Sequence, residues 1–136
     1  MKKLSSILIL SCCSWFATAE VAIVVNTANA NSLDQSAIAK IYLGKSKSFP
    51  SGDKIEFATL DDGHATTEEF NDKVLKKSSS QVNAYWSKLV FTGKGTPPKK
   101  LENDAAMLQF VASNPNAIGF VDAGKVDDSV KVIATF

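Results

Sequence analysis

The segment LDDGHATTEEF, residues 60–70, contains the side chains whose types and spacing best suit binding chemistry. A glycine turn at Gly63, followed by a helix start at Thr66, is typical of an anion cradle, because it leaves backbone N–H groups unpaired near the positive end of a helix. The hydroxyl groups of Thr66 and Thr67 offer further hydrogen bonds. Four carboxylates in the same segment repel an anion, those of Asp61, Asp62, Glu68 and Glu69. From local physics alone, a helix start that binds no ligand is the simpler interpretation.

His64 is the only histidine in the sequence, and the same carboxylates surround it. These are ligand types of a weak divalent-metal site, but a lone histidine near acidic residues is more typical of a surface loop. Nucleophilic catalysis has no better candidate. Outside residues 1–19 the sequence has no cysteine, no G-x-S-x-G elbow and no second histidine. We therefore predict a protein that is not an enzyme, with no catalytic residues, no metal and no cofactor.

Residues 1–19 have the pattern of a secretory signal peptide, with two lysines, an apolar run and the tripeptide ATA. Serines interrupt the run, and it is shorter than the roughly 20 residues of a membrane-spanning helix. We therefore expect export with cleavage before Glu20, and a single domain over residues 20–136. A lipid-anchored start at Cys12 is the alternative interpretation. Both cysteines lie in residues 1–19, so the cleaved chain has no disulfide.

The charge balance of the sequence is close to neutral. All 15 cationic residues are lysines, and without the two in the signal peptide they are one fewer than the 14 acidic residues. This balance gives no basic excess that would indicate binding to nucleic acid or to an anionic membrane. The absence of arginine matters for phosphate, because guanidinium is the side chain that binds phosphate in a bidentate manner.

Four segments are predicted to be strands. VAIVVN, residues 21–26, is a continuous β-branched run, as in a strand covered on both faces. The other three are residues 55–60, 117–121 and 131–136. Helical patterns lie between the strands, and this alternation predicts an α/β domain with a mainly parallel sheet.

Three helices are predicted to begin at capping boxes, formed by Ser32 with Gln35, Thr66 with Glu69, and Ser78 with Gln81. The helix after Ser78 has the clearest apolar stripe, which includes Val90 and predicts that Tyr85 and Trp86 face the core. A fourth, shorter helix is expected at residues 104–112.

Four segments follow one another along the chain: VAIVVN, LDQSAIAKIYLGKSKSFPSGDKI, AYWSKLVFTGKGTPP and NPNAIGFV. Together they resemble the phosphate-type periplasmic substrate-binding proteins of ABC transporters, and more closely the short, single-lobe relatives of these proteins. The similarity runs from about Val21 to Val121. The order and spacing of IYLGK, FTGKG and NPNAIGF carry most of its specificity.

The resemblance implies the type 2 periplasmic-binding architecture, in which phosphate lies between two α/β lobes and is held by hydrogen-bond donors without a metal. This chain then corresponds to one lobe. In the family's phosphate loop an arginine is followed by Gly-Ser-Gly-Thr. Here Gly63 and Thr66 match the family pattern. His64 stands in place of the serine, Ala65 replaces a glycine, and Leu60 occupies the position of the arginine.

We therefore expect a periplasmic solute-binding protein, related to phosphate ABC transporter components, that binds phosphate or a similar small oxyanion. The expected ligand-binding residues are Gly63, His64, Thr66 and Thr67. The expected macromolecular partner is a membrane permease or a sensor protein, and not nucleic acid. The alternative is a ligand-free interaction or sensory module that binds a protein partner or a second copy of itself.

Overall fold

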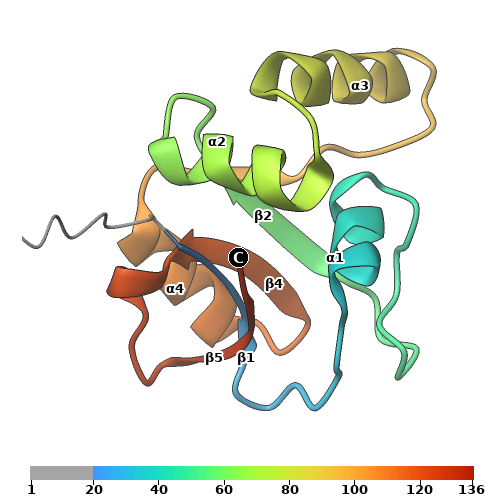
Figure 1. The fold of residues 1–136 in the computed structure, drawn as a ribbon. Coiled ribbons are helices and arrows are strands. Elements are labelled where there is room, and N and C mark those ends of the chain that lie inside the picture. Colours follow the sequence, from blue (N-terminus) through green and yellow to red (C-terminus); the bar gives the residue numbers. More distant parts are fainter. Residues whose placement is uncertain (1–19) are drawn as a thin grey trace, which may run out of the picture.

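Strand β1 (Val21–Asn26) lies inside a five-stranded sheet, and all six of its residues are buried. The computed structural model describes residues 20–136; the predicted signal peptide, residues 1–19, lies outside this range. Helices flank the sheet (Figure 1), so the predicted α/β class is confirmed. In the described range, no helix is both long enough and apolar enough to cross a membrane.

The strand order of the sheet is β3-β2-β4-β1-β5. The other strands are β2 (Glu56–Leu60), β3 (Lys99–Leu101), β4 (Ala117–Asp122) and β5 (Val130–Thr135). Strand β2 pairs in parallel with β3 and β4, whereas β1 pairs antiparallel with β4 and β5. Four strands therefore run in one direction and only β1 opposes them. The sheet is mainly parallel in direction, as predicted, but β1 makes it mixed.

The helices are α1 (Gln35–Tyr42), α2 (Ala65–Phe70), α3 (Ser79–Phe91) and α4 (Asp104–Ser113). A π-helical turn, η1 (Asn71–Leu75), continues α2, and a short 3-10 turn, η2 (Ala123–Lys125), follows β4. The capping box of Ser78 and Gln81 is confirmed at the start of α3. The predicted box at Ser32 is wrong, because Asp34 caps α1 by accepting a hydrogen bond of 2.7 Å from the N–H of Ala37.

Alternate residues of β4 face two different helical layers. The ring of Phe120 stacks on Phe70 of α2, with centroids 4.1 Å apart, and contacts Tyr42 of α1. Gly119 instead lies against Met107 of α4. Because neighbouring residues of a strand point to opposite faces, α1 and α2 cover one face of the sheet and α4 covers the other.

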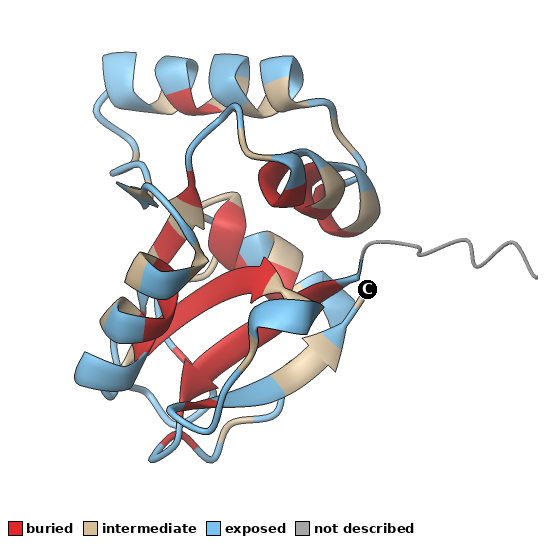
Figure 2. Cartoon of the chain, turned by 90° about the vertical axis from the view of Figure 1, so that its left-hand side faces the viewer, coloured by how far each residue is buried: buried red, intermediate tan, exposed pale blue. Residues whose placement is uncertain are grey.

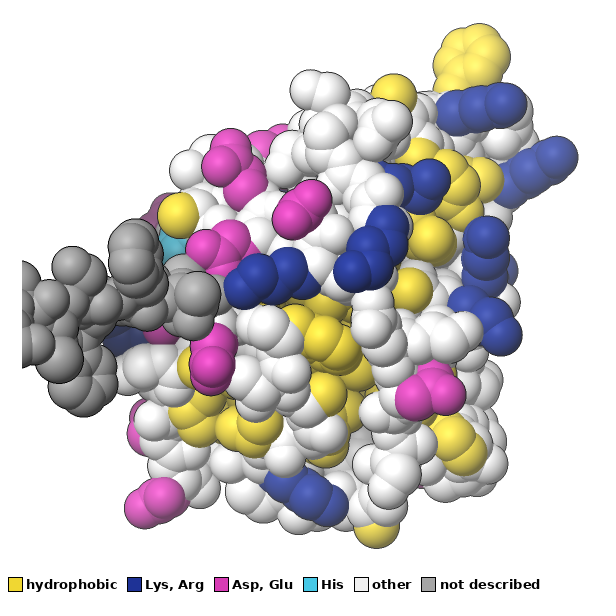
Figure 3. All heavy atoms as spheres, viewed as in Figure 1, with side chains coloured by type: hydrophobic (Ala, Val, Ile, Leu, Met, Phe, Trp, Pro, Cys, Tyr) yellow, Lys and Arg dark blue, Asp and Glu magenta, His cyan; other side chains and the backbone are white. Residues whose placement is uncertain are grey.

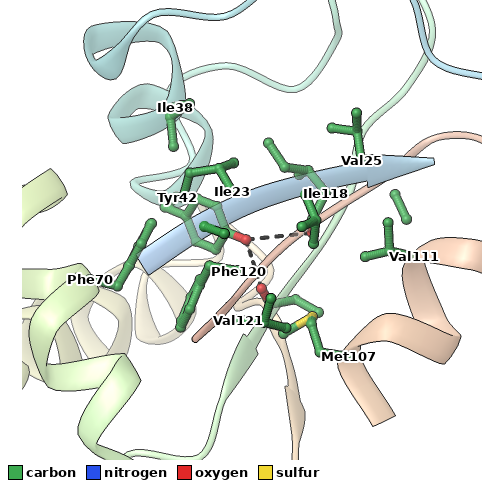
Figure 4. Packing of buried hydrophobic residues seen from close by; sticks show 14 of the residues in the cluster. Ile23, Val25, Ile38, Tyr42, Phe70, Met107, Val111, Ile118, Phe120 and Val121 are labelled. Carbon is green, nitrogen blue, oxygen red and sulfur yellow. Dashed lines mark hydrogen bonds between the residues drawn. The ribbon is translucent and has the colours of Figure 1, made fainter. Parts of the chain in front are cut away.

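Tyr42 holds the aromatic part of the core together (Figure 4). Its ring lies 4.6 Å from the ring of Phe70, and its hydroxyl donates a hydrogen bond of 2.8 Å to the carbonyl oxygen of Ala58. Burial raises the pKa of the Tyr42 hydroxyl far above its usual range, because the phenolate would have to be desolvated.

Helix α3 stands apart from the rest of the domain and is exposed over most of its surface (Figure 2). Three side-chain hydrogen bonds fasten it: from Trp86 Nε1 to the carbonyl oxygen of Tyr42 at 3.1 Å, from the Tyr85 hydroxyl to Leu43, and from Nδ2 of Asn71 to the hydroxyl of Ser79 at 3.1 Å. Trp86 is buried as predicted, and Tyr85 is half-buried. Val90 is 49% exposed, so the C-terminal turn of the stripe does not reach the core.

Candidate functional site

The glycine turn lies where β2 ends and α2 begins. Residues 61–64 form a β-turn closed by a hydrogen bond of 2.9 Å from the N–H of His64 to the carbonyl oxygen of Asp61. The N–H of Asp61 donates to Leu101, the last residue of β3. The turn therefore sits at the carboxyl ends of two adjacent parallel strands, where α/β sheets commonly place their ligands.

Helix α2 begins one residue earlier than the sequence predicts. His64 is its N-cap, and Nδ1 of His64 accepts a hydrogen bond of 3.2 Å from the N–H of Thr66. The predicted capping box of Thr66 with Glu69 is therefore wrong. An imidazole nitrogen can replace the usual oxygen cap because it accepts a hydrogen bond when it carries no proton. Capping thus requires the neutral ring, with its proton on Nε2.

Three backbone N–H groups of the turn remain available. Those of Asp62, Gly63 and Ala65 have no hydrogen-bond partner within residues 20–136, and all three residues are exposed. The N–H groups of Thr66 and Thr67 are already bonded to His64. The structure thus supplies the free donors that an anion cradle needs, all of them from the backbone.

The two threonine side chains are buried beneath the turn. The hydroxyl of Thr67, a residue only 3% exposed, donates a hydrogen bond of 3.0 Å to the carbonyl oxygen of Asp61. Thr66 is 7% exposed. Thr67 therefore holds the shape of the turn, and its proton is already used within the protein.

Two lysines outside residues 60–70 partly neutralise the carboxylates of this segment. Asp62 forms an ion pair of 2.8 Å with Lys100 of β3, and Glu69 forms one of 3.3 Å with Lys73. These lysines offset two of the four carboxylates. Over residues 20–136, no group of three or more histidine, cysteine, aspartate or glutamate side chains has the arrangement of a metal site.

Asp104 is a residue of the site that lies outside the predicted segment. Its Oδ2 atom is 3.9 Å from Nε2 of His64, and its Oδ1 atom accepts a hydrogen bond of 3.1 Å from the N–H of Asp122. The His64 ring therefore lies between the N–H of Thr66 and the carboxylate of Asp104. A local pattern could have identified Asp104 only as the first residue of α4.

A cavity of about 700 Å³ borders the turn. Asp62 and Lys100 line it together with mainly apolar side chains of α2, η1 and α3. Figure 3 shows this apolar surface exposed between α3 and the body of the domain. A ligand on the turn would thus border on an apolar wall that includes Phe70 and Trp86.

The arrangement of strands and helices around this turn matches solved structures. The fold is that of the phosphate ABC transporter substrate-binding proteins. A phosphate transport receptor from Vibrio cholerae superposes with a TM-score of 0.64 at 25% identity, over 85% of this chain and 46% of that one. A phosphate-bound protein from Clostridium perfringens, described as a substrate-binding component of this kind, gives 0.67 at 21% identity, over 85% and 45%.

PstS from Borrelia burgdorferi shares this phosphate-receptor fold at a TM-score of 0.62 and 14% identity, over 85% of this chain and 47% of that one. The chain thus spans less than half the length of these receptors, as expected for one lobe. These neighbours are transport receptors and not enzymes. Protein-family models and curated protein sequences give no match.

Proposed function

We propose that this chain is an exported, periplasmic solute-binding protein that binds phosphate or a similar small oxyanion at the turn before α2. One observation carries the proposal: three unpaired N–H groups, on Asp62, Gly63 and Ala65, gather at a helix start in a domain with the phosphate-receptor fold. Backbone N–H groups at such a position bind phosphate without any cationic side chain.

Lys100 contacts the turn directly, since its ammonium group forms an ion pair of 2.8 Å with Asp62. It stands on the strand beside the turn and offsets part of the charge that repels an anion. A lysine ammonium is a point charge and lacks the bidentate geometry of guanidinium. Losing one charged hydrogen bond removes about 1.5–3 kcal/mol. We therefore expect weaker binding than an arginine-containing loop achieves, and a partner such as a permease or a sensor protein that completes the site.

Replacing Ala65 by proline tests the proposal at a single donor. Ala65 is the first residue of α2, where proline is well tolerated, and His64 before it has the extended conformation that proline requires. Ala65→Pro therefore removes one N–H group while leaving the helix intact. In isothermal titration of inorganic phosphate into residues 20–136 at low salt, we expect it to weaken binding by about ten- to a hundredfold.

The matched control is Gln35→Pro, at the first residue of α1. Asp34 before it is also extended, so this proline is equally compatible with its helix. It should leave phosphate binding unchanged. If the unsubstituted domain gives no heat at millimolar phosphate, or if Ala65→Pro binds as tightly as Gln35→Pro, the turn is not the oxyanion site. The pair Gly63→Val and Thr66→Val is a second test, and unchanged binding would contradict the assignment of these two residues.

A second candidate function is a ligand-free interaction or sensory module. The observation that favours it is that the N–H of Thr66 and the hydroxyl of Thr67 are already bonded within the protein. Size-exclusion profiles of residues 20–136 with and without phosphate separate the two functions. A stable dimer that forms regardless of phosphate, together with no binding heat, would support the interaction module.

A further inference from the structure

On the face shown in Figure 3, many exposed lysines gather in one region and several acidic side chains in another. Figure 3 shows lysines gathered along the side that carries α3, whereas acidic side chains gather over α2 and beside the histidine. The net charge of the protein is therefore near zero although the side that carries α3 has a local excess of positive charge. A local excess of this kind attracts an anionic surface even when the net charge does not.

Part of this lysine-rich side is a depression of about 470 Å³ between the loop before β2 and the loop after α3. Lys47, Lys54 and Lys94 line it, and Glu56 is the acidic residue among its lining side chains. The ion pairs found over residues 20–136 use none of these three lysines. Their ammonium groups are exposed and available to an external anion.

An apolar tip projects beside this depression. Phe91, the last residue of α3, is 92% exposed, and Val90 before it is 49% exposed. Lys88 lies one helical turn before Phe91, on the same side of the helix, and Lys94 follows three residues after it. We name Lys47, Lys54, Lys88, Phe91 and Lys94 together the α3 patch.

We propose that the α3 patch binds the surface of an anionic lipid bilayer, with Phe91 in the interfacial layer and the lysines on lipid phosphates. A phenylalanine that projects clear of the chain amid lysines matches the chemistry of a bilayer interface, where apolar area and lysine charge act together. The residues that α3 exposes before this tip include the polar Gln81, Asn83 and Ser87 as well as the small apolar Ala84. Val90 and Phe91 also line the mainly apolar cavity beside the turn, together with Pro97 and Pro98, so the exposed ring of Phe91 has further apolar area beside it.

Co-sedimentation with vesicles tests this proposal. Residues 20–136 contain the hydrophobic core that the structure describes, and their use avoids any binding by the apolar run of residues 4–16. We expect the domain to sediment with vesicles of equal parts phosphatidylglycerol and phosphatidylcholine, and to remain in solution with phosphatidylcholine alone. Binding should weaken as salt increases, because the lysine contribution is screened.

Two pairs of variants assign the binding to the patch. Lys54→Glu with Lys94→Glu should lower vesicle affinity by about thirtyfold or more, at about 1 kcal/mol per lysine. Lys76→Glu with Lys125→Glu makes the same change in net charge outside the patch and should have little effect. Phe91→Ala should weaken binding about tenfold, whereas Val132→Ala, at an exposed apolar residue of β5, should not.

Several results would overturn the proposal. One is an absence of sedimentation with the anionic vesicles at low salt, which would leave an acidic protein as the partner for the lysines. Another is an equal loss in the two charge-reversed pairs, which would show that net charge alone drives binding. A third is unchanged vesicle binding by Phe91→Ala.

Discussion

Nδ1 of His64 accepts a hydrogen bond from the N–H of Thr66 at 3.2 Å, while Nε2 of the same ring lies 3.9 Å from the carboxylate of Asp104. The first contact needs a nitrogen without a proton. His64 therefore acts as the N-cap side chain of α2. It also connects α2 to the start of α4.

The cap predicts a specific order of stability among His64 variants. His64→Ala removes the acceptor for the Thr66 N–H and should lower the free energy of unfolding by about 1 kcal/mol. His64→Asn supplies a side-chain oxygen at the same position and should unfold close to the original protein. Urea unfolding of the three proteins, followed by Trp86 fluorescence, measures the difference. Equal stability of the alanine and asparagine variants would show that the cap contributes nothing.

Removing the negative charge of Asp104 should increase the affinity for phosphate. Its carboxylate places a negative charge beside His64, and two unit charges 4 Å apart interact by about 1 kcal/mol in water. Asp104→Asn removes the charge while its side-chain oxygen still accepts from the N–H of Asp122. We expect phosphate to bind about fivefold more tightly in isothermal titration. Asp53→Asn, beyond the opposite end of β2, is the control and should have little effect.

Replacing Gly44 by alanine should disturb the attachment of α3 through a steric clash. Its φ is +71°, and an added Cβ atom would lie 2.9 Å from Cη2 of Trp86. Gly52 also has a positive φ, of +95°, but its surroundings are open. Gly44→Ala should therefore cost the backbone strain of about 1–2 kcal/mol plus the displacement of Trp86, whereas Gly52→Ala costs the strain alone. Urea unfolding that gives both variants the same stability would contradict the clash.

The sequence predicts the parts of this fold that depend on local patterns. The continuous apolar runs of β1 and β4 identify buried strands, because only a strand covered on both faces needs such a run. Strand β3 is missed, since it has only three residues, of which Lys99 and Lys100 are exposed lysines, and it forms a strand through its pairing with β2. The helix caps are less predictable, because Ser32 and Asp34 both suit the role and the packing of α1 decides between them.

The candidate site is predictable only in its backbone. The glycine turn and the helix after it follow from the segment that contains Gly63. Lys100 and Asp104 reach the turn through strand pairing and through the start of α4, about 40 residues away in sequence. No pattern within residues 60–70 indicates either contact, and together they change the charge that a ligand would meet.

The buried hydroxyl of Tyr42 should make the stability of the protein fall as the pH rises in the alkaline range. Burial raises the pKa of its hydroxyl, so the folded protein keeps this proton at pH values where the unfolded chain, with a pKa of 10.0, has lost it. The unfolded state then binds fewer protons than the folded state, and stability falls as the pH rises above 10. Tyr42→Phe removes this contribution. At pH 7 the variant should be about 1 kcal/mol less stable, because the hydrogen bond to Ala58 is lost.

Urea unfolding of both proteins from pH 7 to pH 11 measures the difference directly. The difference in stability should stay constant up to about pH 9 and then change by about 1.4 kcal/mol by pH 11, since a tyrosine with an unfolded pKa of 10.0 contributes this linkage one unit above that value. Because the difference at pH 7 is only about 1 kcal/mol, Tyr42→Phe should become slightly the more stable protein at pH 11. Other ionisable groups change both proteins alike and cancel in the comparison. A difference that stays constant to pH 11 would mean that the hydroxyl of Tyr42 ionises in the folded state and that water reaches the aromatic core.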